Sequence, residues 1–227
     1  MDKVALMKRM DTKFVITKSQ LYAVLETLTS DYTVLEIGAN RLMSYISDYY
    51  DTDSKKFYLD HHNKIAKRTK IRIRNYIESG LFFLEIKQKD SKGNTLKKRI
   101  AKNAFEENLS SESMDFIENK TGQRFNLNKT LSNGFQRVTL VNIELKERVT
   151  LDLNLSYNST VLNEALVIVE LKQEKFNRQS PMVKALRKMA IYPYSISKYC
   201  IGLATLFPEI KQNHFKQKFR TINKLTA

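Results

Sequence analysis

The sequence T-K-I-R-I-R-N-Y, from Thr69 to Tyr76, alternates basic residues with aliphatic ones. Residues two apart in a β-strand share a face of that strand. One face of the predicted strand therefore carries three consecutive basic side chains, those of Lys70, Arg72 and Arg74. The opposite face is aliphatic. This pattern predicts a half-buried strand with one cationic face.

The two segments that follow continue the same alternation. L-F-F-L-E-I-K-Q-K, from Leu81 to Lys89, places Glu85 and Lys87 opposite aliphatic side chains. A turn with the sequence D-S-K-G-N then leads into T-L-K-K-R-I, in which Lys97 and Arg99 share a face. The three segments are expected to form an antiparallel meander whose charged faces coincide.

Segments in other parts of the chain have charged residues in the same alternating phase. These residues are Arg9, Asp11 and Lys13, then Arg137, then Arg148, Thr150, Asp152 and Asn154, and finally Glu170 and Lys172. Cations outnumber carboxylates on these faces. The faces of neighbouring strands would therefore combine into one field of positive charge.

A solvated outer face could explain any one of these strands. It explains the set poorly, because like charges on neighbouring strands repel one another. The aliphatic faces also need a cover, and apolar stripes at helical spacing predict helices that can supply it, at Lys18–Leu28, Glu112–Lys120, Met182–Met189 and Ser197–Phe207. A further helix is expected at Ser54–His62. We therefore predict an α+β fold, a closed antiparallel barrel with helices packed outside and a charged interior. Such an interior must be wet or hold an anion.

Composition limits the class of protein and its partners. The chain has 227 residues, a net charge of +15 and one cysteine, Cys200, which excludes an internal disulfide and a zinc finger. Charged residues near the start interrupt any signal-peptide core, and no long apolar run follows. We expect a cytoplasmic protein, with the membrane surface as an alternative location. The charge indicates an anionic partner such as nucleic acid, acidic lipid, nucleotide or polyphosphate.

Several motifs occur together in an order that resembles the VTC domain. They are Y-Y-D-T-D (Tyr49 to Asp53), R-T-K-I-R-I-R-N-Y, F-L-E-I-K-Q-K, L-K-K-R, R-V-T-L-D-L-N-L, V-E-L-K and S-I-S-K-Y-C-I-G. The resemblance extends from about Lys8 to Phe207. VTC domains are triphosphate tunnel metalloenzymes, which implies an eight-stranded antiparallel barrel with a basic lumen. It also implies a polyphosphate polymerase that transfers the γ-phosphate of ATP to a growing phosphate chain.

The resemblance also implies roles for individual residues. We assign Lys13, Arg72, Arg74 and Lys198 to catalysis. Substrate binding is assigned to Lys70, Lys87, Lys97, Arg99, Arg137, Arg148 and Lys172. Glu170 is the expected ligand of a divalent metal, Mn²⁺ or Mg²⁺, with phosphate oxygens and water completing its shell. His61, His62 and His214 are expected to be structural or solvated.

Two departures from the family pattern bear on the reaction. Hydrolases of the tunnel fold carry Glu-x-Glu-x-Lys on the first strand, whereas this chain has R-M-D-T-K, ending at Lys13. Arg9 would repel a second metal, which favours the polymerase over a two-metal triphosphatase or a cyclase. The second departure is Ser195, where relatives can carry a basic residue, and it puts the efficiency of synthesis in question.

Other functions stay open at this point. An inorganic triphosphate or nucleoside triphosphate hydrolase and a non-catalytic polyphosphate-binding module would need the same cations. Nucleic-acid binding is disfavoured, because the basic residues alternate with aliphatic side chains and not with exposed aromatics. The sequence does not assign an oligomeric state.

The chain divides into one predicted domain, residues 1–210, and a basic tail, residues 211–227. The tail contains Lys211, Lys216, Lys218, Arg220 and Lys224 and no acidic residue. We expect it to be frayed and solvated. An alternative is that an apolar helical face docks it on the barrel, on a membrane protein or on an acidic membrane.

Overall fold

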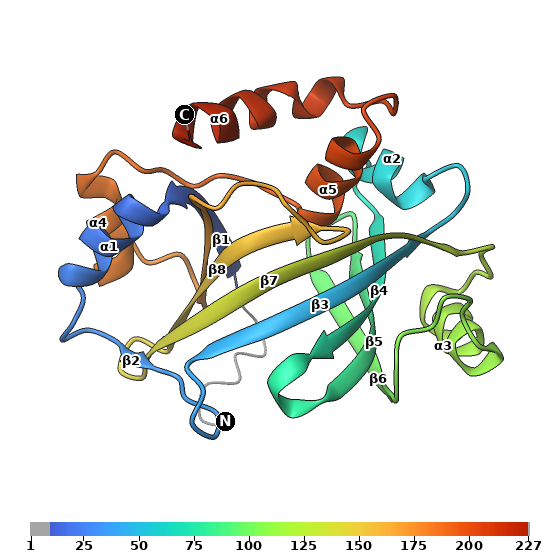
Figure 1. Cartoon of the computed structure of the whole chain (residues 1–227), viewed down its shortest axis with the longest axis horizontal. Coiled ribbons are helices and arrows are strands. Elements are labelled where there is room, and N and C mark those ends of the chain that lie inside the picture. Colours follow the sequence, from blue (N-terminus) through green and yellow to red (C-terminus); the bar gives the residue numbers. More distant parts are fainter. Residues whose placement is uncertain (1–9, 227) are drawn as a thin grey trace.

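The computed structural model describes residues 10–226, and the ten strands of this part of the chain form one antiparallel sheet (Figure 1). In spatial order the main strands are β1 (Met10–Thr17), β10 (Leu166–Gln173), β8 (Glu147–Tyr157), β7 (Asn128–Asn142), β3 (Leu42–Asp51), β4 (Arg68–Tyr76), β5 (Leu81–Lys89) and β6 (Thr95–Lys102). Short strands β2 (Thr33–Val34) and β9 (Thr160–Val161) pair with β7 and β8. The antiparallel α+β class predicted from the sequence is confirmed.

Closure of the sheet differs from the prediction. Strands β1 and β6 form its two ends, and within residues 10–226 no pairing joins them, so the closed barrel is not seen. Both end strands carry basic side chains, Lys13 on β1 and Lys97 on β6. Charged side chains are common on edge strands that stay unpaired.

The sheet is nevertheless curled, so that its charged side chains face one another across a concave face. In a flat sheet with strands about 4.8 Å apart, β5 and β10 would be separated by roughly 24 Å. In the structure burial lowers the pKa of Lys87 on β5. The negative charges of Glu170 on β10 and Asp11 on β1 partly oppose this effect, so both carboxylates lie near Lys87. The two ends of the sheet therefore approach each other around the concave face.

The meander predicted from the sequence is confirmed in its register. Ile71 on β4 is paired with Ile86 on β5, and Lys70 with Lys87. Lys87 is in turn paired with Lys97 on β6. The basic faces of the three strands therefore coincide, and the aliphatic faces form a continuous outer surface.

Helices cover the outer face of the sheet in two places. Helices α1 (Lys18–Glu26) and α4 (Pro181–Lys188) pack on the aliphatic faces of β1, β10 and β8. Helices α2 (Lys56–His62) and α3 (Ser111–Thr121) cover β4 and β5, where Ile71 and Leu84 are fully buried. Three of these helices begin at a capping hydroxyl, from Thr17, Ser110 or Ser180, which satisfies a free backbone N–H of the first turn.

Helix α5 (Lys198–Leu206) was expected outside the sheet but packs on its concave face. Its buried side chains contact Val15, Phe135 and Ile168, which lie on the same strand faces as Lys13, Arg137 and Glu170. The helix approaches β8 so closely that a Cβ on Gly202 would lie 2.2 Å from the Tyr157 ring. One end of the concave face is therefore filled by apolar side chains.

A β-bulge at Asn154 helps to make that apolar end. The pairing of β7 with β8 shifts register between Gly134 and Gln136, and Asn154 has a φ of 51°. Asn154 was predicted to share the charged face with Asp152, but its side chain donates to Gln136 on the outer face. The extra residue turns Leu155 and Tyr157 toward α5, which a strict alternation could not predict.

The C-terminal segment, expected to be a frayed tail, is helical and docked. It forms η3 (Asn213–Phe215) and α6 (Lys216–Thr226), and α6 lies across β1 and β10 (Figure 1). Phe215 and Ile222 are buried against α5, and His62 stacks on His214 with ring centroids 4.6 Å apart. These apolar contacts explain why the segment does not fray. Within residues 10–226 no helix is long and apolar enough to span a membrane.

Candidate phosphate-binding site

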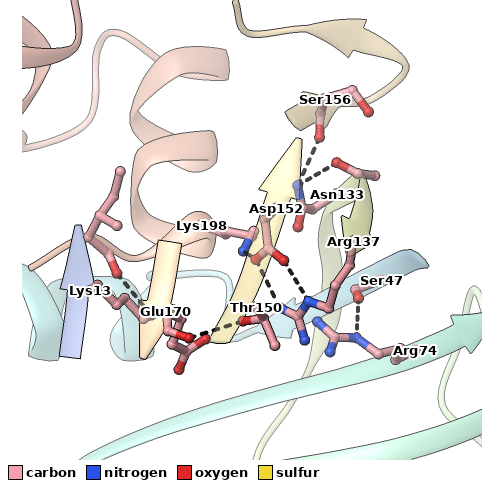
Figure 2. Close-up of polar contacts among 12 residues, drawn as sticks. Lys13, Ser47, Arg74, Asn133, Arg137, Thr150, Asp152, Ser156, Glu170 and Lys198 are labelled. Carbon is pink, nitrogen blue, oxygen red and sulfur yellow. Dashed lines mark hydrogen bonds and ion pairs between the residues drawn. The ribbon is translucent and has the colours of Figure 1, made fainter. Parts of the chain in front are cut away.

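Most of the predicted site residues lie on the concave face in groups around buried carboxylates, and Figure 2 shows the group around Asp152. Asp152 on β8 accepts hydrogen bonds from Arg137, Nε to Oδ1 at 2.5 Å and Nη2 to Oδ2 at 2.8 Å. It also forms an ion pair with Lys198 at the start of α5. Burial alone would raise the pKa of Asp152, but Lys198 and Arg137 hold it well below its usual range. Asp152 is therefore charged and fixes both cations.

A second group surrounds Glu85 on β5. This carboxylate is 2% exposed and accepts hydrogen bonds from Arg72 Nε at 2.9 Å and Nη2 at 2.6 Å. Lys97 on β6 forms an ion pair with its second oxygen. Burial opposes ionisation, but Arg72, Arg74 and Lys97 hold the pKa of Glu85 well below its usual range. These contacts show that Glu85 orients the neighbouring cations.

Arg74 lies against two aromatic rings, Tyr45 and Phe135, which stack on each other. Its Nε donates to Ser47 Oγ at 2.9 Å, and its guanidinium lies 5.4 Å from the Tyr45 ring and 5.3 Å from the Phe135 ring. Burial and the nearby Arg72 charge lower its pKa. Arg74 is thus rigidly placed without a paired carboxylate, and its buried charge favours an incoming anion. The alternation in the sequence predicted that Arg74 lies on the charged face, but it did not predict the contacts of Arg74 with Tyr45 and Phe135.

Lys13 and Lys70 bind the loop that precedes α5. Lys13 Nζ donates to the Ile196 carbonyl at 3.3 Å, and Lys70 Nζ donates to Ser197 Oγ at 2.8 Å. Burial lowers the pKa of Lys70 to about 8, and the charges of Lys13 and Lys87 add to this effect. These lysines come from β1, β4 and β5, so the predicted convergence of distant basic residues is found here.

A divalent metal would find few protein ligands on this face. Glu170 and Asp11 both contact Lys172, with N–O distances of 2.8 Å and 3.7 Å. Burial disfavours ionisation of Glu170, but Lys13 and Lys172 hold its pKa well below its usual range. No group of three or more histidine, cysteine or acidic side chains could hold a metal within residues 10–226. The donors fit an ion that is bound mainly by phosphate oxygens, with Glu170 as a protein ligand.

The remaining predicted residues lie at the margins of this site. Arg99 on edge strand β6 is exposed and stacks on Phe83, with its guanidinium 4.3 Å from the ring. Arg148 is half-buried on the charged face of β8, paired in register with Lys172. Arg9, the residue on which the argument against a second metal rests, lies outside the described residues.

Comparison with known proteins identifies the family. The model of the VTC domain matches residues 8–207. The chain belongs to the VTC domain family. The resemblance seen in the sequence motifs is thereby confirmed, and all the strands and helices α1 to α5 of this VTC domain fall within the match. Helix α6 lies beyond it.

Solved structures with the triphosphate tunnel fold resemble this VTC domain despite low identity. A candidate adenylyl cyclase from Hippeastrum, described as having a dominant triphosphatase activity, aligns with a TM-score of 0.59 at 13% identity, over 88% of this chain and 96% of that chain. A candidate adenylate cyclase from Vibrio parahaemolyticus aligns with a TM-score of 0.53 at 12% identity, over 86% of this chain and 97% of that chain. These likenesses establish a shared fold. No curated protein matches the chain.

Proposed function

We propose that this VTC domain is a metal-dependent polyphosphate polymerase that transfers the γ-phosphate of ATP to a growing phosphate chain. The observation that supports this most is the convergence of basic side chains from both ends of the sheet on one concave face. Membership of the VTC family supports the same reaction. We further propose that the curled sheet encloses the phosphate chain as a tunnel once an anion neutralises the repelling cations.

Phosphoryl transfer requires mainly that the protein position its substrates and neutralise the charge on the transferred group. Arg72 and Arg137 present planar guanidinium groups that suit two phosphate oxygens at once. Because Glu85 and Asp152 hold these arginines before substrate arrives, little reorganisation is needed. Arg74 adds a charge held by aromatic rings. Together they fix the phosphates in the geometry for transfer.

A bound Mn²⁺ or Mg²⁺ would neutralise negative charge on the phosphate groups. Within the chain, Glu170 would hold the metal, and Lys172 would have to release that carboxylate when it does so. Lys13, which is paired in register with Glu170, would then contact the adjoining phosphate. This arrangement makes the metal part of the substrate complex.

Hydrolysis of triphosphate is the second candidate function. One end of the concave face is filled by α5 and the loop around Ile196, which suits a short substrate that enters and leaves by a single opening. The triphosphatase activity described for the Hippeastrum protein, which shares the fold, is compatible with this function. The two reactions differ in whether a phosphate or a water molecule occupies the position in line with the leaving group, which is ADP for ATP and pyrophosphate for inorganic triphosphate.

The product of the reaction distinguishes these functions. Purified protein would be incubated with ATP labelled at the γ-phosphate and with Mn²⁺, and the products separated on a gel. Long labelled polymer supports the polymerase, whereas free orthophosphate without polymer moves the protein to the triphosphatase. Tight polyphosphate binding without turnover would make it a binding module.

A further inference from the structure

A run of basic residues leaves the concave face and reaches the surface between α2 and α6. Neighbouring members of this run are close enough for the charge of one to affect the pKa of another. Arg72 and Lys13 contribute, after burial, to the lowered pKa of Lys87. Lys13 and Lys87 do the same for Lys70. The lowered pKa of Lys218 on α6 reflects burial first and then the charge of Lys64.

His61 on α2 lies where this run meets the surface. Arg68 Nη1 is 3.1 Å from His61 Nδ1, and the His61 ring is 6.1 Å from that of Phe215. Burial lowers the pKa of His61 to about 3, and the charges of Lys70, Arg68, Lys218 and Lys13 add to this effect. A neutral imidazole is therefore surrounded by cations from β4, α6 and β1.

The lysines around the loop before α5 have neutral partners. Lys218 donates to the Ser195 carbonyl, Lys13 to the Ile196 carbonyl and Lys70 to Ser197 Oγ. None of the ion pairs found within residues 10–226 involves these lysines, Arg68 or Lys64. This contrasts with Arg72 and Arg137, each of which has a carboxylate partner. Lys13 has the Glu170 carboxylate close by, but Lys70, Lys218, Arg68 and Lys64 have no such counter-charge among the ion pairs of the described residues, and positive charge of this kind favours an anion.

We propose that Lys64, Arg68 and Lys218 form a second phosphate-binding site, at the junction of α2, β4 and α6, that holds the distal part of a long phosphate chain. The proposal rests on the proposed function for the identity of the chain. Lys218 belongs to the helix beyond the part of the chain that matches the VTC family. The site would therefore be a feature of this protein's own C-terminal helix, and it would select long chains over triphosphate.

The properties of this site favour a phosphate chain over a lipid membrane as the bound partner. A helix that lies in a membrane interface inserts an apolar face. The apolar side chains of α6 are already committed to the protein, since Phe215 and Ile222 are buried and Phe219 packs against the same core. The free face of α6 is basic and polar, and it continues the cationic run from the concave face.

The test compares two phosphate probes of different length. Binding of long-chain inorganic polyphosphate and of inorganic tripolyphosphate would be measured by titration calorimetry with the full chain. Lys218→Gln removes the charge but keeps a donor for the Ser195 carbonyl. Lys64 makes none of the side-chain hydrogen bonds to that loop found within residues 10–226, so Lys64→Gln removes a charge without removing such a bond. The control is the double variant Lys216→Gln/Lys224→Gln, which removes two exposed charges from the same helix.

We expect Lys64→Gln/Lys218→Gln to weaken binding of the long chain about tenfold and to leave tripolyphosphate binding unchanged. The control variant should bind both probes like the parent protein. Equal losses for both probes, no loss for either, or an equal loss in the control would overturn the proposal. So would reduced binding to vesicles of acidic phospholipid with polyphosphate binding intact, which would assign the surface to membranes. Because these measurements need no turnover, failure of the polymerase assay is a separate result.

Discussion

Arg137 on β7 donates two hydrogen bonds to Asp152 on β8, one from Nε at 2.5 Å and one from Nη2 at 2.8 Å. Lys198 from α5 pairs with the same carboxylate, which is 1% exposed. Glu85 holds Arg72 and Lys97 in the same way. Each buried carboxylate thus offsets part of the repulsion between its cations until a phosphate group arrives.

Replacing Asp152 with asparagine should destabilise the protein and make it depend on an anion. Arg137 and Lys198 would be left as uncompensated buried charges, and breaking a buried pair in this way costs about 3–5 kcal/mol. For a protein of this size the Tm should fall by roughly 10 °C. Thermal unfolding with and without tripolyphosphate measures the effect.

Tripolyphosphate should raise the Tm of Asp152→Asn by more degrees than it raises the Tm of the parent protein. The matched control is Asp115→Asn, which removes an exposed carboxylate that pairs with Arg124 on the outer surface. The control should unfold like the parent. If Asp152→Asn keeps the parent Tm, the carboxylate does not hold these cations.

Replacing Glu170 with glutamine should separate binding from chemistry. The substitution keeps the size of the side chain but removes the charge that would hold a divalent metal, so manganese-dependent turnover of ATP should collapse. Binding of metal-free tripolyphosphate should be unchanged or stronger, because a repelling carboxylate is gone. Turnover at the parent rate would show that Glu170 serves only as a counter-charge to Lys13 and Lys172.

Alternation in the sequence was sufficient to predict the strands that carry the site. Lys70, Arg72 and Arg74 on β4, Lys87 on β5 and Glu170 on β10 all lie on the predicted faces, because the period of two is a local property of extended backbone. The same logic failed at Asn154, where a bulge adds one residue to the strand and reverses the faces. A single sequence contains no signal that places such a bulge.

Long-range packing accounts for the other differences. The Ser197–Phe207 helix was predicted correctly, but its position on the concave face depends on Gly202 meeting Tyr157, two residues far apart in the chain. The docking of α6 depends on a similar distant contact between His62 and His214. Charge alternation alone also does not say how far such a sheet closes, and within residues 10–226 the edge strands β1 and β6 are not paired.

Removing single arginines should weaken triphosphate binding. A hydrogen bond to a charged group is worth roughly 1.5–3 kcal/mol, so Arg72→Ala or Arg74→Ala should reduce the affinity about ten-fold to a hundred-fold. Arg124→Ala is the control, because that arginine is exposed and pairs only with carboxylates on the outer surface. Calorimetric titration with tripolyphosphate gives the affinities. Equal affinities in all three variants would remove Arg72 and Arg74 from the binding site.

Binding of tripolyphosphate should weaken as the pH rises through 8. Burial lowers the pKa of Lys70, Lys97 and Lys198 to about 8, so each loses its charge above that pH in the free protein. A bound anion favours the charged forms, and the affinity should fall by up to about tenfold per pH unit for each lysine that must regain its proton. Calorimetry between pH 7 and 9.5 measures the slope, and a flat profile would contradict it.

The same lysines determine how the stability of the free protein depends on pH. Their pKa in the folded protein lies below the value of about 10.4 for an unfolded chain. Between pH 8 and about 9.5 the unfolded chain therefore binds more protons, and stability should rise with pH. Saturating tripolyphosphate should remove or reverse this trend. If the Tm falls over this pH range in the absence of ligand, burial does not disfavour the charged form of these lysines in the folded protein.

Deleting residues 212–227 should lower the stability of the whole protein. The segment buries Phe215 and Ile222 against α5, and its loss would expose their partners on the concave side of the sheet. Burial of one large aliphatic or aromatic side chain contributes about 1.5–3 kcal/mol, so the Tm should fall by roughly 10 °C. Ile222→Asp is a smaller test of the same contact and should lower the Tm in the same direction. Lys224→Ala, on the exposed face of the helix, should leave the Tm unchanged. A truncated protein with the parent Tm would mean that α6 adds nothing to the fold and that the tail behaves as first expected from the sequence.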